Sequence, residues 1–218
     1  MDSLPPAALQ SEIPRSISRE DMAKLAIRRY EGRICLVATP EDLEEARADL
    51  GEESIVGFDT ETRPAFRKGE SHLPALVQVA TARAVYLFQL RRTEVHPLLA
   101  GLLSEARTVK AGISLKDDLR ALKGVFAFEE QNMLDLGLVA RRSGFGQTGV
   151  RNLAGMLLGF RIPKGTKTSN WAAPQLSAAQ IAYAATDAWA CRELTLRFAS
   201  LGLLRAKAPA ASDAAPGG

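Results

Sequence analysis

The stretch IVGFDTET, residues 55–62, decides the fold that we expect for this chain. Its first four residues predict a buried β-strand, and this strand runs into Asp59 and Glu61, which have one residue between them. Side chains two residues apart on a strand point to the same face, so the two carboxylates would lie side by side. Neighbouring carboxylates repel each other unless a cation lies between them, and oxygen ligands suit Mg²⁺ or Mn²⁺. The alternative interpretation is a pair of acids at an ordinary solvated strand end.

The composition favours a protein that folds in water without a membrane partner. Of the 218 residues, 46% are hydrophobic and 24% are charged, which is enough apolar material for a substantial core. The net charge of +3 permits a polyanionic partner but does not require one. We find no secretory leader and no apolar run near the roughly 20 residues of a membrane span. Cys35 and Cys191 lie among apolar residues, so we expect two buried thiols and a cytoplasmic location.

The order of predicted elements indicates an α/β fold, a mixed five-stranded sheet flanked by helices and followed by a helical C-terminal half. We expect a single domain over residues 26–205, between a flexible segment, residues 1–25, and a disordered tail, residues 206–218. Ser114, Asn132 and Ser177 are expected to begin helices, because each is followed by an acid or amide three residues later. Strands are predicted at 34–37, 55–58, 75–80, 84–88 and 109–113, with the third and fourth forming a hairpin.

A second informative carboxylate lies on the helix predicted to begin at Ser114. Asp118 is three residues after Leu115 and four before Leu122, so it falls within the apolar stripe of that helix. Asp117 falls outside the stripe, and at the third helical position its charge can meet the exposed N–H groups. Asp118 therefore needs a partner, either a metal ion or an arginine.

The third informative place is the helix predicted to begin at Ser177. Tyr183 and Asp187 are four residues apart and share one face of this alanine-rich helix. An aspartate in the middle of a closely packed helix is unfavourable unless it is ligated. For Tyr183 alone, the alternative interpretation is a half-buried packing residue.

Other chemistries lack their usual sequence signatures. The sequence contains no His-Glu-x-x-His, no Gly-x-Ser-x-Gly, no phosphate-binding P-loop and no Gly-x-Gly-x-x-Gly. Its two histidines, His72 and His96, match no metal-ligand spacing. We therefore exclude the common zinc-peptidase, serine-hydrolase, nucleotide-triphosphatase and dinucleotide-dependent classes.

Taken in order, Asp59-x-Glu61, Asp118 and Tyr183-x-x-x-Asp187 resemble the three motifs of the DEDDy 3′–5′ exonucleases. These enzymes form a DnaQ-like branch of the ribonuclease H fold. The resemblance covers about residues 30–205 and is closest to ribonuclease D and to the exonuclease domain of the Werner syndrome helicase. The second motif departs from the pattern, since Ser114 stands where many members have Asn and Asp117 where Phe or Tyr is common, so a contribution from Asp117 stays open.

This resemblance implies a two-metal nuclease. Asp59, Glu61, Asp118 and Asp187 would bind two divalent cations, Mg²⁺ or Mn²⁺, and Tyr183 would orient the attacking water. The substrate would be a single-stranded or recessed 3′ end of DNA or RNA, released as nucleoside 5′-monophosphates, with DNA favoured. The alternatives are an RNA 3′-end trimming enzyme like ribonuclease D and a catalytically silent nucleic-acid-binding module.

Substrate contacts are expected on both sides of the acids. Basic side chains could bind phosphates and an aromatic or aliphatic side chain could meet the terminal base, although charged runs are commonly just solvated. The candidates are Thr60 within the first motif, Phe66, Arg67, Lys68 and Leu73 in the loop after it, and Lys164 and Lys167 before the third motif, with Arg63 and Arg161 as further cations.

Overall fold

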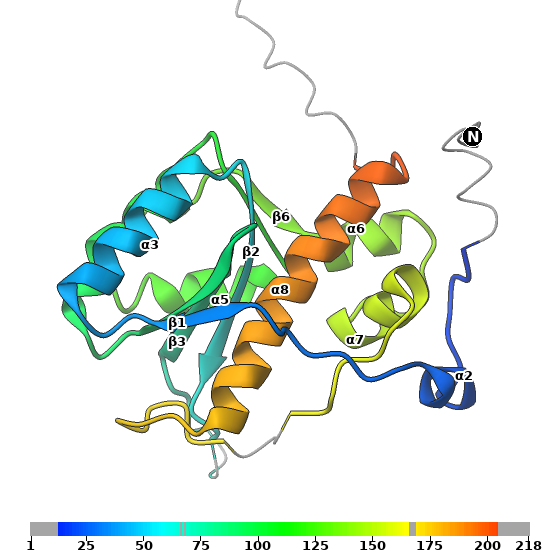
Figure 1. Cartoon of the computed structure of the whole chain (residues 1–218), viewed down its shortest axis with the longest axis horizontal. Helices are drawn as coiled ribbons and strands as arrows, with labels where there is room; N and C mark the ends of the chain where they lie inside the picture. Colours follow the sequence, from blue (N-terminus) through cyan, green and yellow to red (C-terminus); the bar gives the residue numbers. More distant parts are fainter. Residues whose placement is uncertain (1–12, 66, 68, 166–168, 205–218) are drawn as a thin grey trace, which may run out of the picture.

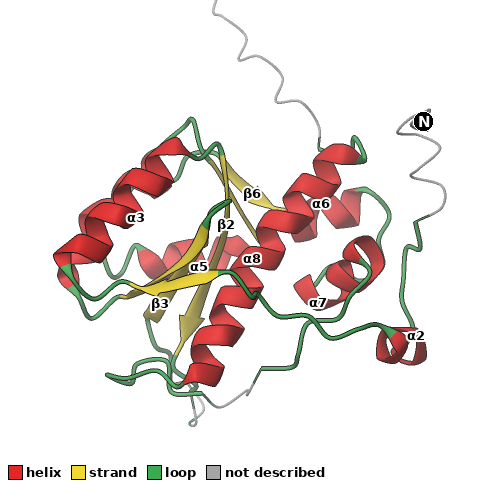
Figure 2. Ribbon diagram, in the orientation of Figure 1, coloured by secondary structure: helices red, strands yellow, loops and turns green. Residues whose placement is uncertain are grey.

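A computed structural model describes residues 13–65, 67, 69–165 and 169–204 of the chain. Its centre is a six-stranded mixed sheet with the strand order β1-β4-β3-β2-β5-β6, and helices lie on both faces (Figures 1 and 2). The strands are β1 (Arg33–Leu36), β2 (Ile55–Thr62), β3 (Pro74–Ala80), β4 (Ala84–Gln89), β5 (Val109–Gly112) and β6 (Met133–Asp135). The helices are α2 (Arg19–Lys24), α3 (Pro40–Glu52), α4 (His96–Ser104), α5 (Leu115–Leu122), α6 (Leu136–Arg142), α7 (Val150–Leu153) and α8 (Ala178–Ser200), with a 3₁₀ turn, η1 (Thr93–Val95), and a π-helical turn, η2 (Ala154–Leu158).

The strand pairing confirms the mixed sheet and the predicted hairpin. Strand β3 pairs antiparallel with both β2 and β4, while β1 runs parallel to β4 and β5 runs parallel to β2. Strand β2 lies in the interior of the sheet. Its residues 55–57 pair with β5 and its residues 57–62 pair with β3, so β3 fixes the part of the strand that carries Asp59 and Glu61.

The prediction of five strands was wrong, because β6 is a sixth strand that pairs parallel to β5. We expected a helix to begin at Asn132, but this residue has a positive φ of 49° and precedes β6. The helix begins only at Leu136, and Asp135 is its N-cap. A strand of three residues is too short to show periodicity, so nothing in the local pattern separated it from a helix start.

Alternation along β2 divides its side chains between the two faces of the sheet. Val56 and Phe58 are buried in the cluster that α3, α4 and α5 cover. Gly57 faces α8, and a methyl group added there would lie 1.9 Å from the carbonyl oxygen of Ala188. Since Asp59 and Glu61 follow Gly57 in steps of two, they point to the α8 face as well.

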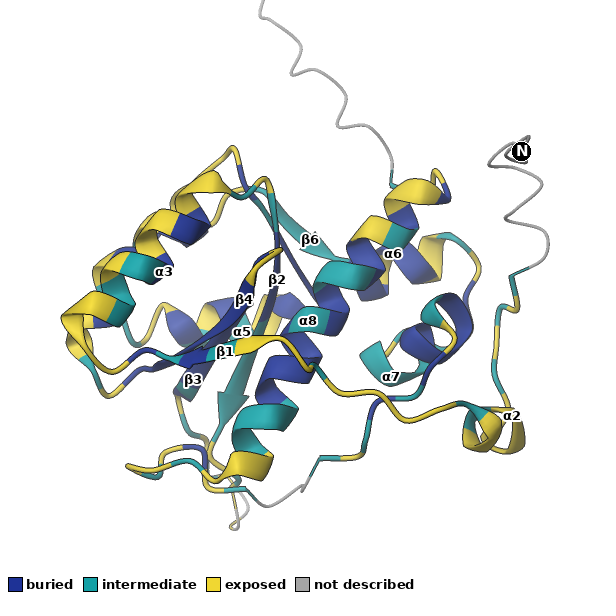
Figure 3. Ribbon diagram, viewed as in Figure 1, coloured by how far each residue is buried: buried dark blue, intermediate teal, exposed yellow. Residues whose placement is uncertain are grey.

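Helix α8 packs its small residues against the sheet, as its alanine content predicts. The side of α8 that meets the sheet is buried and includes Ala184 and Ala188 (Figure 3). The predicted capping box at its start is confirmed, since the Ser177 hydroxyl accepts from the Gln180 N–H and the Gln180 side chain accepts from the Ser177 N–H. Local chemistry thus fixes where the helix begins, and small side chains allow the sheet to approach it.

The segment before β1 runs along the helical half of the molecule (Figure 1). Within residues 1–25, for which we expect flexibility, Ile13 and Ile17 pack against the apolar cluster beneath α6 and α8, and the Ile17 N–H donates to Gln147. The predicted tail, residues 206–218, lies outside the described residues. Both cysteines are free and buried, as predicted. None of the described helices is long and apolar enough to span a bilayer.

Candidate active site

Strand β2 and helix α8 bring three carboxylates together. Asp59, Glu61 and Asp187 each offer an oxygen atom, and these oxygens all lie within 4.8 Å of one another. The pair from β2 is partly exposed, whereas Asp187 is buried. The contact at Gly57 explains the meeting, because it lets α8 approach the strand two residues before Asp59 and next to Asp187.

Burial and mutual repulsion disfavour the charged forms of these acids. Burial, followed by the charges of Asp187 and Glu61, holds the pKa of Asp59 well above its ordinary value. Burial and the charges of Asp187 and Asp118 raise the pKa of Glu61 to about 8. Burial raises the pKa of Asp187 to about 6, although the nearby Tyr183 hydroxyl and Arg151 lower it in part.

The donor set fits a divalent cation. One oxygen of Asp187, Oδ1, is fully buried and has no hydrogen-bond partner among the described residues. A buried carboxylate oxygen without a donor is unfavourable, and a cation would satisfy it and offset the repulsion from Asp59 and Glu61. Three carboxylates within 4.8 Å are also the hard oxygen ligands that Mg²⁺ and Mn²⁺ prefer.

The structure separates the two aspartates of α5. Asp118 is partly buried, and its charge raises the pKa of Glu61 and of Asp59, so it faces the cluster without belonging to the tight group of three. Burial is also the main cause that raises the pKa of Asp118 itself. The Asp117 side chain is 79% exposed and pairs with Arg120 at 3.0 Å, pointing to solvent. The helix-face argument therefore selected the inward-facing residue.

The start of α5 differs from the prediction. Ser114 adopts a left-handed conformation, with φ of 58°, and its side chain caps no N–H group of the helix. Instead the Leu115 N–H donates to Oδ2 of Asp135, at 3.2 Å, from the end of the neighbouring strand β6. The expected capping role of Ser114 was wrong, because the acceptor comes from 20 residues further along the chain.

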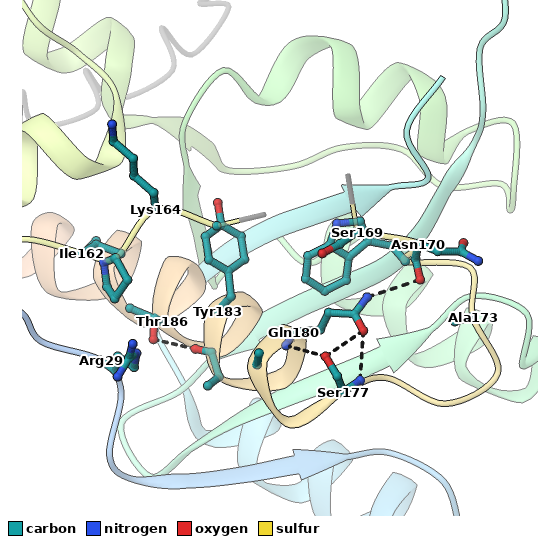
Figure 4. Close-up of a pocket in the computed structure, with 15 residues that line it drawn as sticks. Arg29, Ile162, Lys164, Ser169, Asn170, Ala173, Ser177, Gln180, Tyr183 and Thr186 are labelled. Atoms are coloured by element: carbon teal, nitrogen blue, oxygen red, sulfur yellow. Dashed lines mark hydrogen bonds between the residues drawn. The ribbon is translucent and has the colours of Figure 1, made fainter. Parts of the chain in front are cut away.

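Tyr183 stands beside the acids on α8. Burial and the charge of Asp187 hold the pKa of its hydroxyl far above the ordinary value, so the group stays protonated at neutral pH. Its ring is pressed against Gly165, where an added methyl group would lie 2.3 Å from a ring carbon, and its centroid is 6.1 Å from that of Trp171. Figure 4 shows the ring projecting from α8 into the space between Lys164 and Ser169.

A cavity of about 600 Å³ opens next to Tyr183 (Figure 4). Its floor is the outer side of α8, and its rim includes the segment around Trp171 and the basic side chains of Arg29 and Lys164. Gln180 ties this rim to α8, since its Nε2 donates to the Asn170 carbonyl at 3.3 Å. Tyr183 is the residue of the candidate site that lines this cavity, whereas Asp59, Glu61 and Asp187 are not among its lining residues.

The predicted substrate contacts lie in different settings. Phe66, Lys68 and Lys167 lie outside the described residues. The side chains of Arg63, Arg67 and Lys164 are exposed, Leu73 is 53% exposed, and Arg161 is partly buried where its backbone pairs with Ile27. Thr60 lies between the two acids in sequence, so its side chain points to the opposite face of β2, where its buried hydroxyl interacts with Asp118 and lowers the pKa of that carboxyl. The substrate-binding roles of these residues stay predictions.

Sequence reasoning missed Arg151 and Asp135. Arg151, on α7, lowers the pKa of Asp187, and its Nε donates to the carbonyl of Ile162 at 3.0 Å. No spacing in the sequence connects either residue with the acids. For Asp135, the residue type was the available sign, because aspartate is among the preferred N-cap residues.

Comparison with known proteins identifies the family. A family model described as 3′–5′ exonuclease matches residues 34–201. The chain belongs to the 3′–5′ exonuclease family. This confirms the predicted membership and a hydrolase of the nuclease class.

Relatives of this exonuclease domain include larger proteins. A ribonuclease D of Gluconacetobacter diazotrophicus is 33% identical over 156 residues, which are 70% of this chain and 39% of that protein. The bifunctional 3′–5′ exonuclease/ATP-dependent helicase WRN of Mus musculus is 28% identical over 73% of this chain and 12% of its own length. The chain therefore spans about two fifths of the length of that ribonuclease D.

Solved structures confirm the ribonuclease H-like exonuclease fold. The Nibbler EXO domain of Aedes aegypti aligns with a TM-score of 0.69 and 24% identity over 81% of this chain and 92% of that domain. Escherichia coli RNase D aligns with a TM-score of 0.68 and 19% identity over 79% of this chain and 46% of that protein. At these identities the likeness supports the fold alone.

Proposed function

We propose that this protein is a divalent-metal-dependent exonuclease that releases nucleoside 5′-monophosphates from single-stranded 3′ ends of RNA. The observation that carries the proposal is the group of three carboxylate oxygens within 4.8 Å, one of which belongs to the residue with a buried, unpartnered oxygen. Family membership supports the 3′ to 5′ direction. The relatives named ribonuclease D move our expectation from DNA to RNA.

Four acids would hold two Mg²⁺ or Mn²⁺ ions, namely Asp59, Glu61, Asp118 and Asp187. When bound, the ions supply the charge that activates water and stabilises the pentavalent phosphate and the leaving oxygen. The acids themselves bind and position, because each must lose its proton to act as a ligand.

Tyr183 would orient the water by hydrogen bonding. Its raised pKa makes it a poor base at neutral pH, so its contribution is a fixed donor or acceptor beside Asp187. Its contacts with Gly165 and Trp171 restrict the ring to one place. Removing the hydroxyl while keeping the ring should therefore leave the packing intact.

The exposed cations Arg67 and Lys164 would bind backbone phosphates of the incoming strand, and Leu73 would meet the terminal base. Phosphate contacts position a strand without reading its sequence, so we expect little sequence preference. On the basis of its two free buried thiols, we also propose that the protein is cytoplasmic.

The test is a time course on 5′-labelled RNA and DNA of one sequence, with Mg²⁺, with Mn²⁺ and with EDTA. We expect single-nucleotide shortening of RNA, abolished by EDTA and by Asp59→Asn, and blocked by a 3′-phosphorothioate end. Faster shortening of DNA would overturn the sugar assignment alone. Binding of both strands without shortening of either would identify a silent nucleic-acid-binding module instead.

A further inference from the structure

Two helices begin at the same carboxylate, that of Asp135. Its Oδ1 accepts from the N–H groups of Gly137 and Leu138, at 2.9 and 3.2 Å, and so caps α6. Its Oδ2 accepts from the N–H of Leu115 at 3.2 Å, which is the first residue of α5. The strands explain this geometry, because Gly112 and Asp135 are paired across β5 and β6, and α5 begins just after β5.

The first turn of helix α5 depends on this carboxylate as a hydrogen-bond acceptor from outside the helix. The first four N–H groups of a helix have no acceptor within it, and a side chain normally supplies one. Ser114 does not do so, since it is left-handed and its hydroxyl makes no capping bond. The start of α5 is therefore attached to the edge of the sheet through Asp135.

The same helix carries Asp118 three residues after Leu115, about one turn away. Asp118 reaches toward Asp59 and Glu61, which sit on β2, next to β5 in the sheet. A shift at the start of α5 would move Asp118 relative to the acids of β2. Because metal ligands need a fixed separation, the attachment at Leu115 affects the site even though Asp135 is outside the group of three.

We propose that Asp135 is a positioning residue that holds α5, and with it Asp118, at the separation needed to bind the second metal ion. This role rests on the proposed function. It differs from simple capping of α6, because it assigns the two oxygens of one carboxylate to different helices.

The two oxygens can be separated by Asp135→Asn. The Asn Oδ1 can still accept from Gly137 and Leu138, whereas its Nδ2 would point a donor at the Leu115 N–H. The opposite orientation of the amide would keep the hydrogen bond from Leu115 but lose those from Gly137 and Leu138. The orientation with Oδ1 toward α6 is therefore favoured. Asp135→Ser is a second variant, because a serine can cap α6 but is too short to reach α5.

Three measurements on the full chain test the proposal. Mn²⁺ titration by calorimetry should show affinity about 10-fold weaker in both variants, the lower end of the range for outer-shell residues. Amide exchange of Leu115 in the metal-free protein should be about 5- to 10-fold faster, the factor for one lost hydrogen bond. The kcat on RNA should fall and recover at high Mn²⁺, with little change in the metal-free melting temperature.

Asp42→Asn is the matched control, because Asp42 also accepts two backbone N–H groups at a helix start, those of Ala38 and Thr39, on α3. It should leave Mn²⁺ affinity unchanged. If the wild-type protein binds Mn²⁺ and degrades RNA, and Asp135→Asn binds Mn²⁺ with the same affinity, the positioning role alone would be overturned. An unchanged chain that binds no Mn²⁺ would overturn the proposed function, and the positioning role with it.

Discussion

Replacing Glu61 by Gln should stabilise the metal-free protein at pH 8. Between pH 4.5 and 8 the folded state keeps a proton on Glu61 that the unfolded chain has released, so the free energy of unfolding falls as pH rises through this window. A rise in pKa from 4.5 to about 8 corresponds to at most about 5 kcal/mol, and partial solvent access reduces this to about 2 kcal/mol. For a chain of this size, about 2 kcal/mol raises the melting temperature by roughly 4–8 °C.

The assay is thermal unfolding at pH 4.5 and pH 8, with EDTA and with Mn²⁺. We expect Glu61→Gln to melt higher than the unchanged protein at pH 8 in EDTA, and the difference to shrink toward zero at pH 4.5. Mn²⁺ should raise the melting temperature of the unchanged protein more than that of the variant, because the variant lacks a ligand. Glu129→Gln, at an exposed position, is the matched control. It should change neither the melting temperature at pH 8 in EDTA nor the increase that Mn²⁺ causes. Equal melting of Glu61→Gln and the unchanged protein at pH 8 would refute the argument that repulsion among the acids costs stability.

Three further changes test the site and its support. Tyr183→Phe should lower kcat by about 10²–10⁴, with RNA affinity in Ca²⁺ unchanged, and a normal kcat would reduce Tyr183 to a packing residue. Asp118→Ala should remove nearly all turnover, whereas Asp117→Ala should leave activity intact and cost at most about 1 kcal/mol in urea unfolding, since Asp117 is exposed; the reverse pattern would reassign the ligand. Gly57→Ala should lower the free energy of unfolding by about 3 kcal/mol or more, because its methyl group would lie 1.9 Å from a backbone oxygen of α8, while Gly101→Ala, with nothing within 4 Å, should be neutral or stabilising.

The acids were predictable because their grouping follows from local geometry. Asp59 and Glu61 share a strand face by a spacing of two, and Tyr183 and Asp187 share a helix face by a spacing of four. The start of α8 was predictable for the same reason, since Ser177 and the amide three residues later cap each other. The resemblance to a nuclease family then related three separate places in the chain.

The errors occurred where the deciding contact is distant in sequence. Ser114 has the residue type of a helix cap, yet the start of α5 is satisfied by Asp135. Strand β6 exists because β5 offers it an edge, and three residues cannot signal that pairing by themselves. The prediction of a helix start at Asn132 was wrong for this reason, because the residues that follow Asn132 form strand β6.

At the contact between Gly57 and Ala188, main-chain atoms set the distance between β2 and α8 next to the site. The residue two positions after the glycine is Asp59, and the residue before the alanine is Asp187, so the closest approach of strand and helix lies beside two proposed ligands. Main-chain atoms cannot adjust by changing rotamer. A displacement of α8 from the sheet would therefore directly change the distance between the carboxylate oxygens of Asp59 and Asp187. Under the proposed function, metal binding and the packing of α8 on the sheet would therefore be coupled, because an ion between these ligands would hold the two layers together and the layers would set the width of its site.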